Sequence, residues 1–256
     1  MNANALFAIG KDHTICEDYA IAKVSNGFAY AIVSDGCSAS DEVDFGARVL
    51  VMSAKNSLMH SYIDNAKMFG DETIFDANKV YKIFPYLHPQ ALDATLLAMW
   101  VQDNRCTAYL YGDGVFIHKT GAEVYFVHVH LTSGAPDYLS YSLDSKRKLA
   151  YDSMVDNKKI ISTSHHGQLD GKPFEPFVIT DNVREGDVIA VISDGINSFR
   201  KADNTAMPWQ ELIEEFVGYK TFEGEFVIRR LSAFKRKCMK EGITHSDDIS
   251  IASIIV

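Results

Sequence analysis

The chain has 256 residues, of which 47% are apolar, and its formal net charge is −9. This length allows a sizeable core, so we expect a single domain over residues 1–256 with insertions near 64–90 and 132–172. The acidic balance argues against nucleic-acid binding, and no apolar run in the sequence approaches the eighteen or so residues of a membrane span. We therefore expect a cytoplasmic protein with neither nucleic acid nor membrane as a partner.

The first predicted elements are a hairpin and a helix. Residues 18–24 and 28–34 have strand-like alternation and are joined by Ser-Asn-Gly, a tight-turn signal. Apolar residues then recur at helical spacing from Val43 to Leu58, which predicts a helix. Residues 64–90 are less regular and indicate only a short helix near 78–84.

Strand patterns dominate the middle of the chain. They cover residues 92–101, 106–112, 115–119 and 123–131, with turn signals between them. This pattern predicts a meander of antiparallel strands. The next segment, 132–172, has little periodicity, and SHHGQLDGKP within it, with His165 and His166, is expected to be a mobile, solvated loop.

The last part of the chain mixes strands and helices. Strands are predicted at 174–180, 187–193 and 247–256, with one helix opened by Pro208 and another from 224 to 240 that Gly242 stops. Many antiparallel strands interrupted by separate helices predict an α+β fold. Two antiparallel sheets packed face to face and flanked by helices would account for the number of strands.

Carboxylates recur where the predicted strands end. They are Glu17 and Asp18 in CED, Asp35 in SDG, Asp113 in GDG, Asp194 in a second SDG, and Asp247 with Asp248 in DDIS. Either SDG alone would be explained by a turn after a buried strand, but two copies with further carboxylates indicate a shared site. Converging carboxylates in a dry cleft need a cation, and oxygen ligands favour magnesium or manganese.

In this order, CED, SDGCSAS, YGDG, SDG and DDIS resemble the motifs of the metal-dependent serine/threonine protein phosphatases of type 2C (the PPM family), in their bacterial form. The resemblance covers about residues 10–50, 92–130, 187–198 and 245–256. It implies an α-β-β-α sandwich. It also implies hydrolysis of phosphoserine and phosphothreonine in a phosphorylated protein substrate, by a water that bridges two Mg2+ or Mn2+ ions.

The resemblance also implies roles for single residues. Asp35 would bridge the two ions, and the Gly36 carbonyl would bind the second of them. Glu17 would lie beside that second ion. Asp194 and Asp247 would complete the ligands of the first ion, so that the two SDG aspartates would share one metal.

Asp113 and Asp248 extend this set. Asp113 resembles a carboxylate that helps to hold a third, weaker ion in bacterial members. Adjacent strand residues point to opposite faces, so only one of Asp247 and Asp248 can reach the first ion, and the family pattern selects Asp247. Asp248 then has either a supporting role behind the ligands or plain solvent exposure.

Two residues depart from the family pattern. His13 stands where the family has a catalytic-site Arg that binds the substrate phosphate. A largely neutral imidazole would bind the phosphate less tightly than an arginine. An equally favoured alternative is that His13 is only a surface residue of a strand. Cys37 stands where many members have a proposed general-acid His, and we expect it to be a packing residue. These departures leave two alternatives open: a catalytically weak or inactive phosphatase-like regulatory or binding protein, and a metal-stabilised structural domain.

One further pair has a spacing that can bind a metal. His128 and His130 share one face of a predicted strand. The polar outer face of an amphipathic strand is the simpler explanation of this pair.

Overall fold

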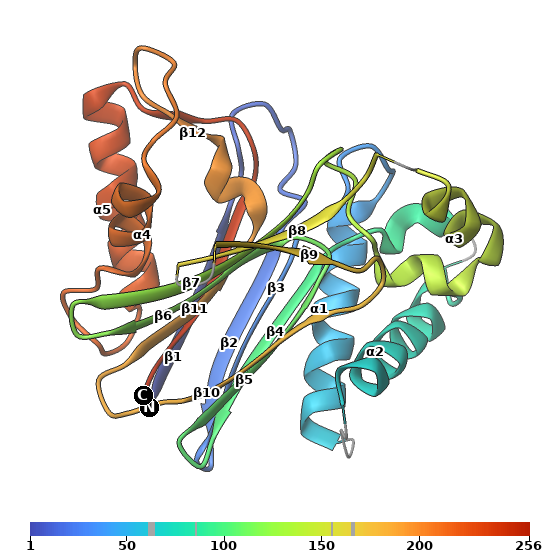
Figure 1. The fold of residues 1–256 in the computed structure, drawn as a ribbon, viewed down its shortest axis with the longest axis horizontal. Coiled ribbons are helices and arrows are strands. Elements are labelled where there is room, and N and C mark those ends of the chain that lie inside the picture. Colours follow the sequence, from blue (N-terminus) through green and yellow to red (C-terminus); the bar gives the residue numbers. More distant parts are fainter. Residues whose placement is uncertain (61–64, 85, 155, 165–166) are drawn as a thin grey trace.

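Two β-sheets pack face to face, with helices on both outer sides (Figure 1). The computed structural model describes residues 1–60, 65–84, 86–154, 156–164 and 167–256. Every neighbouring pair of strands within the two sheets is antiparallel. This arrangement confirms the predicted α+β sandwich of two antiparallel sheets flanked by helices.

The larger sheet has seven strands and is covered on its outer face by two helices. Its strands, in spatial order, are β1 (Asn2–Ala8), β14 (Ile249–Ile255), β11 (Val188–Ile192), β6 (Gly114–Thr120), β7 (Glu123–Leu131), β8 (Lys159–Thr163) and β9 (Gly167–Gly171). The covering helices are α4 (Trp209–Val217) and α5 (Phe226–Glu241). Phe216 and Phe234 from these helices are buried against Ile117 and Ile251 of the sheet.

The smaller sheet has five strands and carries the other helical layer. Its strands, in spatial order, are β10 (Phe177–Asn182), β5 (Arg105–Tyr111), β4 (Leu96–Gln102), β3 (Phe28–Ser34) and β2 (Tyr19–Ser25). Helices α1 (Val43–His60) and α2 (Ala66–Tyr81) cover its outer face (Figure 1). None of the helices among the described residues is long and apolar enough to cross a membrane.

Short elements complete the chain. They are the 3-10 helices η1 (Pro89–Leu92), η2 (Leu139–Leu143) and η3 (Asp194–Ser198), the helix α3 (Ser145–Asp152), and the paired short strands β12 (Phe199–Arg200) and β13 (Thr244–His245). Alternate residues of the strands fill the layer between the large sheets, among them Val33, Met99, Phe116 and Val191. The sandwich therefore has a continuous apolar interior that holds the strand ends in fixed positions.

Two sequence-based expectations about local structure are wrong, and one strand was missed. Residues 66–81 form a full helix, α2, instead of a short helix near 78–84. Residues 167–171 form strand β9, which pairs with β8, so the predicted mobile loop is largely a hairpin; His165 and His166 lie outside the described residues. Strand β1 was not predicted at all, because its sequence NANALFA has no β-branched residue.

The predicted meander also divides between the two sheets. Strand β5 belongs to the five-stranded sheet and β6 to the seven-stranded sheet, so the chain changes sheets at residues 112–113. Gly112 and Gly114 flank Asp113 with φ angles of 84° and 133°, which an L side chain rarely adopts. This crossing leaves Asp113 between the two sheets.

One end of the sandwich collects the acidic loops. Asn2 of β1 lies opposite Ile255 of β14 at the other end, near the chain termini in Figure 1. The opposite strand ends lead into the segments 9–18, 35–42, 112–113, 193–198 and 246–248. All of the carboxylates predicted from the sequence lie in these segments.

Candidate metal centre

Three carboxylates from both sheets form the centre of the site. Asp18 precedes β2, Asp35 follows β3, and Asp194 follows β11. Burial raises the pKa of Asp35 well above its ordinary value, and the charges of Asp18 and Asp194 raise it further. Burial likewise raises the pKa of Asp18 to about 7. These shifts show that the three side chains are close enough to repel one another.

Asp113 and Asp247 also lie close enough to Asp194 to feel its charge. Burial, and after it the charge of Asp194, raises the pKa of Asp113 and also that of Asp247. Asp113 is almost fully buried, whereas the Asp247 side chain is 39% exposed. Asp194 is thus the common neighbour of Asp35, Asp113 and Asp247.

The glycines of the two SDG motifs allow the close packing of these strand ends. A Cβ atom on Gly195 would lie 1.7 Å from the carbonyl oxygen of Asp248, so no other residue fits there. At Gly36 a Cβ atom would lie 2.9 Å from the Cβ of Val43 and 3.0 Å from the carbonyl oxygen of Glu17. Each Ser-Asp-Gly therefore combines an aspartate that enters the cluster with a glycine that lets a second segment approach.

His13, Glu17 and Asp248 form a second group next to the first. His13 Nδ1 lies 3.1 Å from Asp248 Oδ2 and 3.6 Å from Glu17 Oε2, and His13 Nε2 lies 3.5 Å from Asp247 Oδ1. Burial opposes protonation of His13, but these carboxylates outweigh it and raise the pKa of the imidazole. The contact with Asp248 lacks hydrogen-bond alignment, so the attraction is electrostatic. His13 is thus a loop residue among carboxylates, and the alternative of a surface strand residue is wrong.

Asp248 supports the loop that carries His13 and Glu17. Its Oδ1 accepts the backbone N–H of Gly10 at 2.7 Å, and its Oδ2 accepts that of Glu17 at 2.6 Å. The residue is 1% exposed, so the alternative of plain solvent exposure is wrong. Ligand atoms of His13, Glu17 and Asp248 lie within 4.8 Å of one another, close enough to share a metal ion. Because both Asp248 oxygens already accept backbone N–H groups, we regard Asp248 as part of the framework.

The donor set is suited to a hard divalent cation. Buried oxygens of Asp18, Asp194 and Glu17 have no hydrogen-bond donor among the described residues. Leaving a buried carboxylate oxygen unpaired is costly, and so is gathering several carboxylates in one place. A magnesium or manganese ion would relieve both costs, since each prefers oxygen ligands.

Sequence reasoning missed two residues of the site. Asp18 was noted beside Glu17 but given no role, yet it is the more deeply buried of the two, at 1% exposure. Ser193 was overlooked, although its hydroxyl donates to Asp18 Oδ2 at 2.7 Å. The signal for Asp18 was available, because Asp18 begins the alternating pattern of β2 and its neighbour Glu17 must point elsewhere.

A cavity of about 560 Å3 adjoins the site on the side of Asp113. Its walls include Tyr111, Tyr138 and Phe174, with the exposed Lys148 at the rim. A buried ion pair, between Lys159 Nζ and Asp137 Oδ2 at 2.6 Å, also lines the cavity. The charge of Asp137 raises the pKa of Asp113, and the charge of Lys159 lowers it. The segment 132–172 builds much of this cavity.

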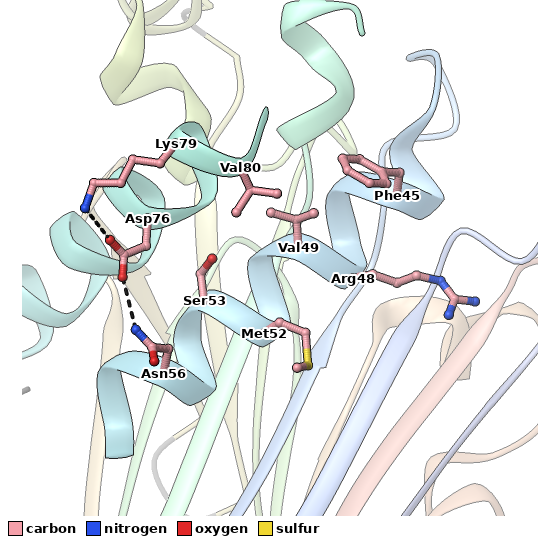
Figure 2. A pocket seen from close by; sticks show the side chains of 9 residues that line it. All are labelled: Phe45, Arg48, Val49, Met52, Ser53, Asn56, Asp76, Lys79 and Val80. Carbon is pink, nitrogen blue, oxygen red and sulfur yellow. Dashed lines mark hydrogen bonds and ion pairs between the residues drawn. The ribbon is translucent and has the colours of Figure 1, made fainter. Parts of the chain in front are cut away.

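A different hollow lies between α1 and α2, as Figure 2 shows. Val49, Val80 and Phe45 give it an apolar wall. Its polar groups bond to one another, since Asp76 accepts from both Asn56 and Lys79. Asp76, the one carboxylate among its described lining residues, is already paired, so this hollow is not a candidate active site.

Comparison with known proteins agrees with the fold and the motifs. The sequence model of the family Protein phosphatase 2C matches residues 10–234, and the chain belongs to this family. No curated protein sequence matches the chain.

Solved structures show the same fold at low sequence identity. The serine/threonine phosphatase of S. agalactiae superposes with a TM-score of 0.60 and 14% identity, covering 100% of this chain and 99% of that one. The catalytic domain of the phosphatase PstP in complex with two manganese ions gives 0.52 and 14%, covering 98% and 96%. RsbX in complex with magnesium gives 0.51 and 15%, covering 98% and 92%.

Proposed function

We propose that this protein hydrolyses phosphoserine and phosphothreonine in phosphorylated proteins with the help of magnesium or manganese. Membership of the protein phosphatase 2C family supports phosphatase activity. The observation that carries the proposal is the convergence of Asp35, Asp113, Asp194 and Asp247 at one end of the sandwich. The charge of Asp194 raises the pKa values of the other three, and a buried oxygen of Asp194 has no hydrogen-bond partner among the described residues. Such an arrangement is unfavourable unless a cation occupies it.

The proposed ligands are divided between the sheets. Asp35 and the Gly36 carbonyl come from the end of β3, and Asp194 and Asp247 come from the ends of β11 and β14. Glu17 lies beside this set and Asp113 at its other side, where a third ion would be held. When bound, two such ions supply Lewis-acid activation of a water and neutralise charge on the phosphoryl group.

His13 is proposed to contact the substrate phosphate. Its surroundings raise the pKa of the imidazole, so a larger fraction is protonated near neutral pH than in a free histidine. A protonated imidazole donates charge-assisted hydrogen bonds to phosphate oxygens. The carboxylates around His13 thus compensate partly for the absent arginine.

A second candidate function is a phosphatase-like protein with weak or no turnover. The observation that favours it is that both ring nitrogens of His13 lie within 3.6 Å of carboxylate oxygens, which compete with a phosphate for the imidazole. This protein would bind metal and phosphoprotein without rapid hydrolysis.

One assay separates the two functions. Hydrolysis of para-nitrophenyl phosphate and of a phosphothreonine peptide is measured with manganese, with magnesium and with chelator. We expect metal-dependent turnover that falls by at least about a hundredfold in Asp35→Asn and in Asp194→Asn. Asp103→Asn, which removes an exposed carboxylate from the β4–β5 turn at the far end of the sheet, is the matched control and should retain full activity.

The outcomes are distinct. Calorimetric manganese binding without turnover would support the second candidate function. A folded Asp35→Asn protein with near-normal rates would overturn the assignment of the site.

A further inference from the structure

A second cavity, of about 420 Å3, lies on the helix-facing side of the seven-stranded sheet. Phe126, His128 and His130 of β7 line it, facing Trp209 at the start of α4. The intervening Val127 and Val129 point the other way, into the layer between the sheets. The two histidines therefore enter one cavity, which the proposed phosphatase chemistry does not use.

The two imidazole rings are close together. Their centres are 4.9 Å apart and their planes are inclined by 31°. In metal sites the metal–nitrogen distance is roughly 2.0–2.1 Å, and the nitrogen–metal–nitrogen angle lies between a right angle and a tetrahedral angle. Two imidazoles that bind one ion in this way have ring centres roughly 4.5–5.2 Å apart. The observed separation is within this range without any rearrangement of the strand.

One nitrogen atom of each ring has at most a weak partner among the described residues. His130 Nδ1 is buried and has no hydrogen-bond partner among the described residues. His128 Nε2 has only a long contact, 3.4 Å, with the amide of Asn197. Burial, together with the neighbouring His130, lowers the pKa of His128 to about 4, so this ring is in the neutral form that binds metals.

Besides the two histidines and the apolar Phe126, Trp209 and Ile213, the described cavity wall has three polar side chains, none of them charged. Ser162 lies opposite His128 in the strand pairing, and Gln168 lies opposite Ser162. Gln210 completes this side of the wall. A site with imidazole ligands and no carboxylate favours nickel, copper or zinc over magnesium and manganese, which prefer carboxylate oxygens.

We propose that His128 and His130 together bind a divalent transition-metal ion of the nickel, copper and zinc group, through one imidazole nitrogen each. Water and carboxamide oxygens of the wall would complete the coordination. The site is separate from the carboxylate cluster, and its existence does not depend on phosphatase activity.

Tryptophan fluorescence tests the proposal directly. The chain has two tryptophans. The Trp209 ring centre lies 4.9 Å from that of His128, whereas Trp100 packs against Phe69 and Tyr109 in the other helical layer. Titration with NiCl2 in excess MgCl2 should quench the fluorescence saturably, because a paramagnetic ion would lie beside Trp209. The Trp209→Phe protein should lose the quench while calorimetry still detects nickel binding.

Variants identify the ligands. Loss of residues that merely support a ligand typically weakens metal affinity about 10- to 100-fold, so His128→Gln and His130→Gln should each weaken nickel binding by at least about tenfold. His13→Gln and Asp194→Asn, in the carboxylate site, are the matched controls and should leave the nickel titration unchanged. Quenching that survives in folded His128→Gln and His130→Gln proteins would overturn the proposal.

A measurement on the unaltered protein covers the case in which these variants do not fold. With 15N-labelled histidine and excess MgCl2, ZnCl2 should shift the ring signals of two histidines together. No shifted histidine signals, or shifts of the His13 signals alone, would refute the site. Nickel binding by a protein without phosphatase activity would leave this proposal intact and count only against the proposed function.

Discussion

Ser193 donates its hydroxyl hydrogen to Asp18 Oδ2 at 2.7 Å, although the two residues are 175 positions apart in the chain. Ser193 directly follows the strand β11 of one sheet, and Asp18 precedes β2 of the other. The same hydroxyl oxygen accepts the backbone N–H of Ser250 at 2.9 Å. One buried hydroxyl therefore joins three segments of the carboxylate site.

Replacing Ser193 by Ala should destabilise the fold by about 1 to 3 kcal/mol, because it leaves buried polar partners unsatisfied. Urea unfolding of both proteins in the presence of chelator measures the difference. Ser142→Ala, which removes an exposed hydroxyl that bonds within its own short helix, is the control and should change stability little. Equal midpoints for Ser193→Ala and the unaltered protein would show that the contact contributes no stability.

Without metal, stability should fall as the pH rises from about 4 to about 7. The pKa of Asp18 is ordinarily 3.8 and is raised to about 7 in the folded protein, so the folded state binds more protons than the unfolded state in this window. The raised pKa values of Asp35, Asp113 and His13 act in the same direction. Thermal melting in chelator should give a higher Tm at pH 5 than at pH 8.

Manganese should remove this pH dependence, because a bound cation stabilises the ionised carboxylates. Asp18→Asn should reduce it in chelator, and Asp103→Asn should leave it unchanged. The lowered pKa of Asp187 acts only below its ordinary value of 3.8, outside the window. Burial lowers the pKa of His128 from 6.5 to about 4, and this shift opposes the fall between these two values. The deciding quantity is therefore the difference between the unaltered protein and Asp18→Asn: an equal dependence of Tm on pH in both would contradict the repulsion within the cluster.

Asp247→Asn and Asp248→Asn should fail in different ways. Asp247 is partly exposed and neighbours Asp194, so its change should lower turnover by about a hundredfold or more with little effect on folding. Asp248 accepts two backbone N–H groups, and an amide can replace only one of its oxygens. The substitution Asp248→Asn should therefore chiefly lower the midpoint of urea unfolding. If Asp248→Asn has the larger effect on turnover at equal stability, the two roles are exchanged.

His13→Arg should strengthen substrate binding. A permanently charged guanidinium gives two donors to a phosphate, and the gain is about 1 to 2 kcal/mol, or roughly five- to thirtyfold in KM. In the unaltered protein KM should rise as the pH climbs through the pKa of the imidazole, and His13→Arg should flatten that rise. KM for a phosphothreonine peptide between pH 6 and 8.5 in saturating manganese is the deciding quantity. Lys11→Arg, an exposed change in the same loop, is the control; identical KM curves for all three proteins would remove His13 from the phosphate.

Most strands and the carboxylate set were predictable because their signals are local. Alternation, turn residues and the order of the motifs need only a few neighbouring positions. Helix α2 was hidden because its buried face contains Gly70 and Thr73, which break the apolar pattern. Gly70 is required there because a Cβ atom would lie 2.8 Å from the ring of Tyr111, a contact that no local pattern reveals.

The parts of the site that escaped prediction depend on contacts between distant segments. Ser193 acquires its role only when β11 and β2 come together, and Asp18 differs from Glu17 only in which way its side chain points. Asp248 is buried because the loop from Gly10 to Glu17 folds over it. Such contacts arise from packing of the two sheets, which the sequence pattern does not encode locally.

The division of the carboxylates between the two sheets affects when the site can exist during folding. Asp18 and Asp35 belong to strand ends of one sheet, while Asp194 and Asp247 belong to strand ends of the other, and these ends meet only after the sheets have docked. The chain must close loops of more than about a hundred residues before a cation finds its ligands. A partly folded chain therefore offers no complete binding site, and uptake of a cation by this cluster would mark the last step of folding.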